Sequence, residues 1–361
     1  MKLRLGSTLP LLCLLLGGTA LAEEGLRDKA KGLFEPVPQT APGFPGEATT
    51  PEKIALGKML FFDARLSENQ DLSCSLCHNP SMGGVSGQFL SSGHHGELGG
   101  RNVLTVFNAV FNIAQYWDGR AAGLKEQVEA SIMSSPAALL KTRGGPMAVP
   151  AATTGLAKQR VIERFKTIPG YVETFKKAFP DAVEPVTYDN VARAIAQFEA
   201  TLITPESPFD RWLKGDDTAL APEQLQGLAL FIQKGCAACH NGVNLGGTGY
   251  ARFGVVQSPS PELLPPDDWG RAAVSKKVED KYVFKVPNLR NVELTAPYFH
   301  TGGTDDLKEA VAVMAATQLG VALAPEEIAS IVAFLKSLTG PPPQIVLPML
   351  PPNPPRAKAH P

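Results

Sequence analysis

Apolar residues recur at helical spacing in four segments of the chain, whereas strand-like alternation is scarce. The first segment follows Thr50-Pro51-Glu52, a hydroxyl cap with proline at the first helical position, and continues to Phe61. The second runs from Pro222 to Phe231. The other two open at Thr187 and Pro325, and their apolar faces are Val191, Ile195, Phe198 and Leu202, and Ile328, Val332, Leu335 and Leu338. The pattern predicts a mainly α-helical fold with long loops and few strands.

The first and second segments form a weak internal repeat. Each reads Pro-Glu, then Gly, then Leu-Phe, and each leads into a Cys-x-x-Cys-His pentapeptide. Gly57 and Gly227 occupy the shared glycine position, and we expect each to let another helix cross closely; an ordinary helix glycine is the alternative. The repeat predicts two cytochrome c-like domains.

The flanking segments differ in composition from these domains. Residues 23–48 are rich in Pro and Gly and are predicted to be an extended lead-in, and the linker at 214–217 marks the expected domain boundary. The domains are therefore placed at 49–213 and 214–340. The tail, 341–361, has nine prolines in 21 residues and is predicted to be extended or disordered.

Residues 1–22 have the pattern of a secretory signal peptide. Lys2 and Arg4 precede an apolar run at 9–16, and Ala20-Leu21-Ala22 resembles a cleavage site. We expect cleavage after Ala22 and a periplasmic protein; an uncleaved anchor is the alternative. No later stretch approaches the roughly 20 apolar residues of a membrane span.

Charge excludes some classes of partner. The chain has 34 basic and 35 acidic side chains, so there is no basic excess for binding nucleic acid or a membrane surface. Its length is sufficient for two domains with their own cores.

Two pentapeptides carry the candidate chemistry: Cys74-Ser75-Leu76-Cys77-His78 and Cys236-Ala237-Ala238-Cys239-His240. This motif attaches a c-type haem through two thioethers, and its histidine becomes an axial iron ligand. Four of the five cysteines lie in these motifs, and no further Cys or His has zinc-like spacing. The sequence therefore predicts two covalent haems rather than redox or zinc sites.

The second axial ligands decide what each iron can do. Methionine with histidine gives a high potential, whereas an open position permits peroxide chemistry. His94 lies in a Gly-rich loop, 91–100, which suits a detachable ligand, although a plain surface histidine would have the same pattern. Met314 follows an apolar helical segment, whose pattern alone favours a core residue.

Several longer blocks resemble the bacterial dihaem cytochrome c peroxidases over about residues 51–340. These blocks are Gly100-Arg101-Asn102, Thr105-Val106-Phe107-Asn108-Ala109, Gln115-Tyr116-Trp117-Asp118-Gly119-Arg120, Cys239-His240-Asn241-Gly242, Pro287-Asn288-Leu289-Arg290-Asn291-Val292 and Leu294-Thr295-Ala296-Pro297-Tyr298-Phe299-His300.

The resemblance implies a role for each matching residue. His78 would be the proximal ligand of a low-potential, peroxide-handling haem, and His94 its removable distal ligand. His240 and Met314 would bind a high-potential haem that receives electrons. The resemblance also places Trp117 between the haems, His300 near the electron-transfer haem, and a Ca²⁺ at Asn102 and the backbone oxygens of Thr295 and Pro297.

One departure from the family concerns the distal acid/base. The family has a Glu after a Gln that is retained here as Gln127, but direct alignment puts Ala137 at the Glu position. Alignment on Gly145-Pro146 instead puts Pro146 there, and no acidic residue occurs between Glu129 and Glu163. Unless Glu126 or Glu129 reaches in from the preceding helix, turnover should be weaker, since a positioned acid/base is worth about 10²–10⁴-fold in rate.

The sequence thus predicts a periplasmic enzyme that reduces H₂O₂ with electrons from a small c-type cytochrome or cupredoxin. Family members are often homodimers. A dihaem enzyme that oxidises a protein side chain is an alternative, although such enzymes have Tyr where this chain has Met314. A dihaem electron carrier is a further alternative, since the distal Glu is missing.

Overall fold

The computed structural model describes residues 23–44, 47–67, 69–93, 98–132 and 151–355. The predicted signal peptide lies outside these residues, as do His94 and most of the altered segment after Gln127. None of the described helices is both long and apolar enough to cross a membrane.

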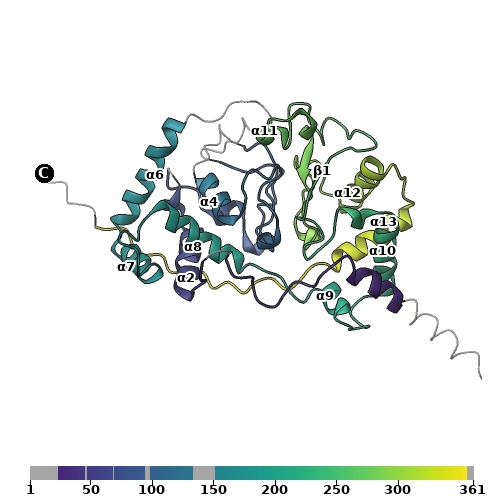
Figure 1. Cartoon of the computed structure of the whole chain (residues 1–361), viewed down its shortest axis with the longest axis horizontal. Helices are drawn as coiled ribbons and strands as arrows, with labels where there is room; N and C mark the ends of the chain where they lie inside the picture. Colours follow the sequence, from purple (N-terminus) through teal and green to yellow (C-terminus); the bar gives the residue numbers. More distant parts are fainter. Residues whose placement is uncertain (1–22, 45–46, 68, 94–97, 133–150, 356–361) are drawn as a thin grey trace, which may run out of the picture.

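Helices dominate the structure and form two lobes (Figure 1). The α-helices are α2 (Pro51–Phe62), α3 (Cys74–Cys77), α4 (Leu124–Ile132), α6 (Ala151–Lys166), α7 (Pro169–Ala178), α8 (Tyr188–Ala200), α9 (Pro208–Leu213), α10 (Pro222–Gln233), α11 (Ala272–Ser275), α12 (Leu307–Met314) and α13 (Pro325–Lys336). The strands β1 (Tyr250–Arg252) and β2 (Val283–Lys285) pair antiparallel and form the only sheet in the described part of the chain. The predicted mainly helical fold class is confirmed.

Each lobe is built around one close helix crossing. A Cβ added at Gly57 of α2 would lie 1.8 Å from the backbone oxygen of Ala194 on α8, and one added at Gly227 of α10 would lie 1.8 Å from that of Ser330 on α13. Both glycines therefore permit backbone contact that no other residue would allow. The predicted repeat and its two crossings are confirmed.

Local sequence explains where the paired helices begin. The Thr50 side chain accepts a hydrogen bond from the backbone N–H of Lys53, and Thr187 caps α8 by accepting one from Asn190. α10 and α13 both begin with proline at the first helical position. The buried faces of these helices then form one core in each lobe.

The N-terminal segment departs from the prediction of extended chain. Residues 23–31 are helical, and Ala30 and Phe34 are buried in the core of the second lobe. Leu26, Ala30 and Leu33 recur at helical spacing, a signal that the prolines and glycines of the following residues obscured. The segment then runs extended to α2 in the first lobe (Figure 1).

The second lobe also begins earlier than the predicted boundary at residue 214. Phe209, Trp212 and Leu213 of α9 are buried in its core, so α9 belongs with the second lobe. Aromatic residues of a short helix are driven into the nearest apolar core, whereas the linker at 214–217 is only a turn within that lobe.

The proline-rich tail crosses back to the first lobe (Figure 1). It has no helix or strand from 341 to 355. Ile345 packs against the first core, and the Asn353 side-chain oxygen accepts a hydrogen bond from Arg65 at 2.7 Å. Both end segments therefore connect the lobes.

We expect Gly57→Ala to destabilise the protein by about 1–3 kcal/mol, because the methyl group would overlap the Ala194 backbone. Urea unfolding of the haem-loaded protein measures this. Gly25→Ala is the matched control: it lies in the 23–31 helix with open space around its Cβ, and helix propensity favours alanine there. Equal urea midpoints of unfolding for Gly57→Ala and Gly25→Ala would contradict the close crossing of α2 and α8.

Candidate functional site

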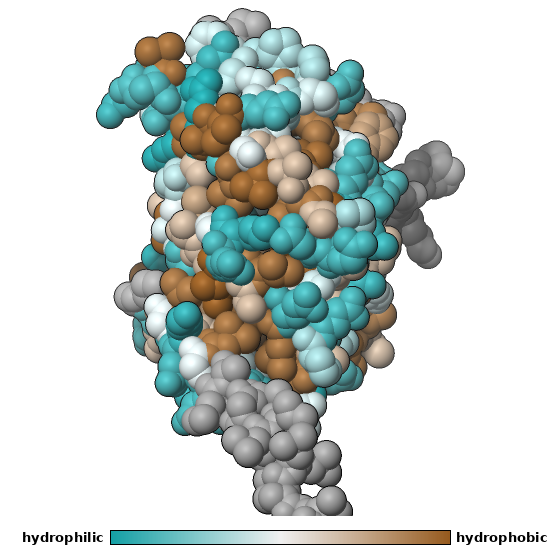
Figure 2. All heavy atoms as spheres, turned by 90° about the vertical axis from the view of Figure 1, so that its right-hand side faces the viewer, coloured by the Kyte–Doolittle hydropathy of each residue, from teal (hydrophilic) through white to brown (hydrophobic). Residues whose placement is uncertain are grey.

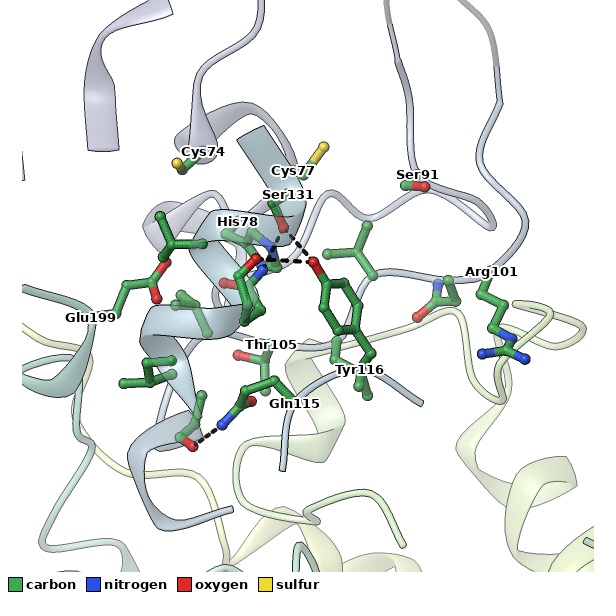
Figure 3. A pocket seen from close by; sticks show the side chains of 18 of the residues that line it. Cys74, Cys77, His78, Ser91, Arg101, Thr105, Gln115, Tyr116, Ser131 and Glu199 are labelled. Carbon is green, nitrogen blue, oxygen red and sulfur yellow. Dashed lines mark hydrogen bonds between the residues drawn. The ribbon is translucent and has the colours of Figure 1, made fainter. Parts of the chain in front are cut away.

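The first cavity lies in the first lobe and has a volume of about 260 Å³. Cys74, Cys77 and His78 line it, as Figure 3 shows. Because α3 is a single turn, closed by a hydrogen bond from the His78 N–H to the Cys74 carbonyl at 2.9 Å, both thiols and the imidazole reach one space. This is the arrangement that covalent attachment of a haem requires.

Burial keeps these three groups neutral. It lowers the pKa of the His78 imidazole, and it raises the pKa of the Cys74 and Cys77 thiols. A neutral imidazole has a nitrogen lone pair available for a metal. Neither cysteine forms a disulfide, so both remain available for thioethers.

The second cavity repeats this arrangement in the second lobe, with a volume of about 450 Å³. Cys236, Cys239 and His240 line it together with Met314. Nδ1 of His240 lies 3.1 Å from the Leu245 carbonyl oxygen, so when Nδ1 carries the proton its Nε2 is available for a metal. Burial lowers the pKa of His240 to about 4, which keeps the ring neutral. Met314 and His240 can therefore act on one iron.

Met314 occupies a special position on its helix. It is the last residue of α12, and the chain continues as a π-helical turn at Ala315–Leu319. Such turns are frequent at functional sites because they redirect side chains.

Unpaired donors in the second cavity fit a haem. Lys285 is 1% exposed, and its Nζ has no hydrogen-bond partner among the described residues. Nδ2 of Asn288, which also lines the cavity, has none within the same part of the chain. Burial lowers the pKa of Lys285 to about 8, a cost that an anionic partner would remove. The two propionates of a c-type haem are carboxylates of the required charge, so the residues fit the cofactor.

Trp117 and residues 102–105 line both cavities and so form the wall between them. The Trp117 indole N–H donates to the Asn102 carbonyl at 3.0 Å, and the Trp117 carbonyl accepts from the Lys285 N–H at 2.7 Å. The indole is therefore held between the two candidate haem sites by both lobes.

The comparisons with known proteins agree with this geometry. Residues 51–218 match the family model for di-haem cytochrome c peroxidase, and residues 225–339 match that for cytochrome c. The chain is 48% identical to cytochrome c551 peroxidase of Pseudomonas aeruginosa over 95% of both chains. The chain belongs to the di-haem cytochrome c peroxidase family.

Other similarities support this membership. The chain is 45% identical to cytochrome c551 peroxidase of Nitrosomonas europaea, covering 86% of this chain and 87% of that protein. A crystal structure of a MauG-like protein associated with microbial copper homeostasis is 25% identical, with a TM-score of 0.71 over 84% of this chain and 95% of the other. The predicted family, the two c-type haems and the assignment as a peroxidase enzyme are confirmed.

A buried charge network joins the two lobes of this peroxidase beside Trp117. Arg101 forms ion pairs with Asp118 at 2.8 Å and with Asp268 at 2.6 Å. Although burial opposes its charge, the two carboxylates hold the pKa of Arg101 above its usual range. His300 stacks on Phe284 at 4.4 Å and lines the second cavity, where the resemblance placed it. The network fixes the wall between the cavities.

The predicted calcium ligands Asn102, Thr295 and Pro297 all line the second cavity. Nδ2 of Asn102 donates to the Gln88 carbonyl at 3.0 Å, which holds the side chain in one orientation. These three residues come from two distant parts of the sequence and line the same cavity, and the calcium site stays a prediction.

Gln127, which the resemblance places in the distal stretch of the peroxide-handling site, lies on α4 and lines the first cavity. Its Nε2 donates to Ser131 at 2.9 Å, and the Tyr116 hydroxyl lies 2.7 Å from the same serine oxygen (Figure 3). Ser91, Ser92 and Gly93, which precede His94, also line this cavity. Polar groups of α4, Tyr116 and the segment before His94 therefore line one cavity.

The acidic residues suggested from sequence are not part of the first cavity. Glu126 is exposed, and Glu129 forms an ion pair with Lys125 at 3.2 Å. Glu199 of α8 is instead the one carboxyl-bearing residue among the described residues that line this cavity. Sequence reasoning missed it because it falls on the buried face of a core helix, although alignment of α8 with α13 would have marked it.

Proposed function

We propose that this peroxidase works in the periplasm and reduces H₂O₂ to two waters, using two protons and two electrons from a small c-type cytochrome or cupredoxin. The observation that carries the proposal is the pairing of unlike cavities across one tryptophan. The second cavity offers both His240 and Met314, whereas the first offers His78 opposite polar groups and a Gly-rich loop. The bound haems would supply the irons at which electrons are stored and peroxide is cleaved.

The residues of the first cavity would admit and orient peroxide. His94 would be a removable ligand of the first haem iron, and Gly93 and Gly96, which lie beside His94 and His95 in the sequence, suit a ligand that is released on reduction. Gln127 and Ser131 would then face the substrate as hydrogen-bonding groups. A Ca²⁺ on the oxygens of Asn102, Thr295 and Pro297 would couple the loop to the lobe interface.

Electrons would enter at the second lobe and pass Trp117. Cys239 is exposed whereas His240 is buried, so one edge of the second haem would lie near the surface. Figure 2 shows the outer face of this lobe, where apolar patches alternate with hydrophilic bands. A mixed surface of this kind suits the small, short-lived interfaces of electron-transfer partners.

Replacement of His94 by glycine tests the proposal. We expect a high-spin ferric signal in the fully oxidised protein and peroxide consumption without prior reduction, because the sixth position would be open. Absorption spectroscopy and peroxide turnover of the haem-loaded protein measure this. His360→Gly, in the proline-rich tail, is the matched control and should leave both unchanged.

The wild-type protein gives a second outcome to check. Reduced by one electron, it should consume peroxide and show one high-spin haem. If both irons stay low-spin and no peroxide is consumed, the chain is an electron carrier and the proposal fails.

A further inference from the structure

Glu199 occupies a position that the internal repeat defines. Ala194 on α8 and Ser330 on α13 are the residues that Gly57 and Gly227 contact at the two helix crossings. Five residues beyond each crossing point lie Glu199 and Leu335. Glu199 lines the first cavity and Leu335 lines the second, so the repeat places a carboxyl in one site where the other has an apolar side chain.

The carboxyl of Glu199 is buried without a counter-charge. Glu199 is 4% exposed, and burial is the one influence on its carboxyl within the described residues, with no hydrogen bond or ion pair. The titratable groups that face it are the Cys74 thiol, which a thioether would replace, and the Tyr116 hydroxyl. Figure 3 shows Glu199 on the Cys74 side of the cavity.

Neighbouring cations are engaged elsewhere. Arg120, which also lines the cavity, pairs with Asp118 at 2.9 Å. Arg101 pairs with Asp118 and Asp268, as described above. On the helices packed against α8, Lys53 of α2 pairs with Glu47, and Lys125 of α4 pairs with Glu129 and Asp189.

Burial alone therefore sets the protonation of this group. It raises the pKa of Glu199 to about 8, because an unpaired carboxylate is costly in a space of low dielectric. A change of one charge on the nearby cofactor would then decide whether the carboxyl is ionised, since charges interact strongly in such a space.

We propose that Glu199 is a redox-linked proton site of the first haem. When the ferric iron accepts one electron from a donor or a chemical reductant, the Glu199 carboxylate takes one proton from solvent. On oxidation the carboxyl returns that proton, so the charge of the cavity stays the same in both states. Leu335 cannot do this, and the second haem therefore lacks the corresponding proton site. The inference depends on the proposed function only in requiring a haem at Cys74, Cys77 and His78.

Potentiometric titration of the haem-loaded protein tests this inference. Between about pH 6 and 9, the reduction equilibrium of the first haem should become tenfold less favourable per pH unit, about 59 mV for one electron. Glu199→Gln should flatten this dependence, because an amide does not ionise, while the potential of the second haem keeps its wild-type pH dependence. Glu199→Asp keeps a carboxyl and should keep the pH dependence of the first haem's potential.

Glu126→Gln, on the exposed face of α4, is the matched control and should leave the potentials of both haems unchanged.

The outcomes separate this inference from the proposed function. The role of Glu199 would be overturned if the potential of the first haem had the same pH dependence in the wild type and in Glu199→Gln. Both proteins must carry two haems in this comparison. Loss of the slope in both Glu199→Gln and Glu199→Asp would also overturn it. A wild type with the expected slope but no peroxide consumption would support Glu199 and contradict the proposed peroxidase reaction.

Discussion

Arg290→Met is expected to lower the free energy of unfolding by about 3–5 kcal/mol, because it leaves the Asp210 carboxylate buried without its counter-charge. The two side chains are 2.8 Å apart, and both are 0% exposed. Burial lowers the pKa of Arg290 even with Asp210 beside it, so the guanidinium charge depends on this partner.

The effect should be large because Arg290 holds three segments together. Its guanidinium donates to the Val243 carbonyl at 2.9 Å, to the Ser207 hydroxyl at 3.0 Å and to the Glu35 carbonyl at 3.0 Å. Asp210 in turn accepts a hydrogen bond from the Val37 N–H at 3.2 Å. The pair therefore ties the N-terminal segment and α9 to the second core, and its removal should release both.

Chemical denaturation of the haem-loaded variant measures this loss. The double variant Arg290→Met with Asp210→Leu should recover only the part of the loss that comes from the unpaired charge, because the hydrogen bonds to Val243, Ser207, Glu35 and Val37 remain lost. Lys177→Met removes one partner of the exposed pair with Glu173 and should leave the free energy of unfolding almost unchanged, because water screens that pair. If Arg290→Met costs no more than Lys177→Met, the buried pair does not stabilise the fold as inferred.

Met314→His should lower the potential of the second haem by roughly a few tenths of a volt, a fraction of the ≈ 0.8 V that axial ligands span. A thioether ligand favours the ferrous iron, whereas a second imidazole favours the ferric iron. Met314 lines the cavity that contains His240, at the end of α12 where the backbone turns into the π-helix. Electrons would then no longer enter at a haem of higher potential, and peroxide turnover with a small cytochrome donor should fall.

A redox titration followed by absorption spectroscopy measures the shift. Met349→His is the matched control, since Met349 is 94% exposed in the tail and cannot reach an iron. Unchanged potentials in the Met314 variant would show that this methionine packs in the core without binding iron, which is the alternative that its helical pattern allowed.

Much of the fold was predictable because its signals are local. The cap at Thr50 and the prolines at the starts of α10 and α13 each act within one turn of helix. The crossing glycines contact distant helices, but the internal repeat marked their positions. The end segments were less predictable. Residues 23–31 were expected to be extended, and α9 was assigned to the first domain, because the core that each joins lies far away in the chain.

The candidate site shows the same contrast between local signals and contacts that are distant in the sequence. By itself the sequence determined that two haems are attached, because Cys-x-x-Cys-His brings its three groups together within a single turn. Only the tertiary structure decided that Trp117 separates the two cavities, that the Lys285 ammonium is buried without a hydrogen-bond partner among the described residues, and that Glu199 lines the first cavity. Burial and proximity depend on which helices pack together, and that packing joins residues more than a hundred positions apart in the sequence.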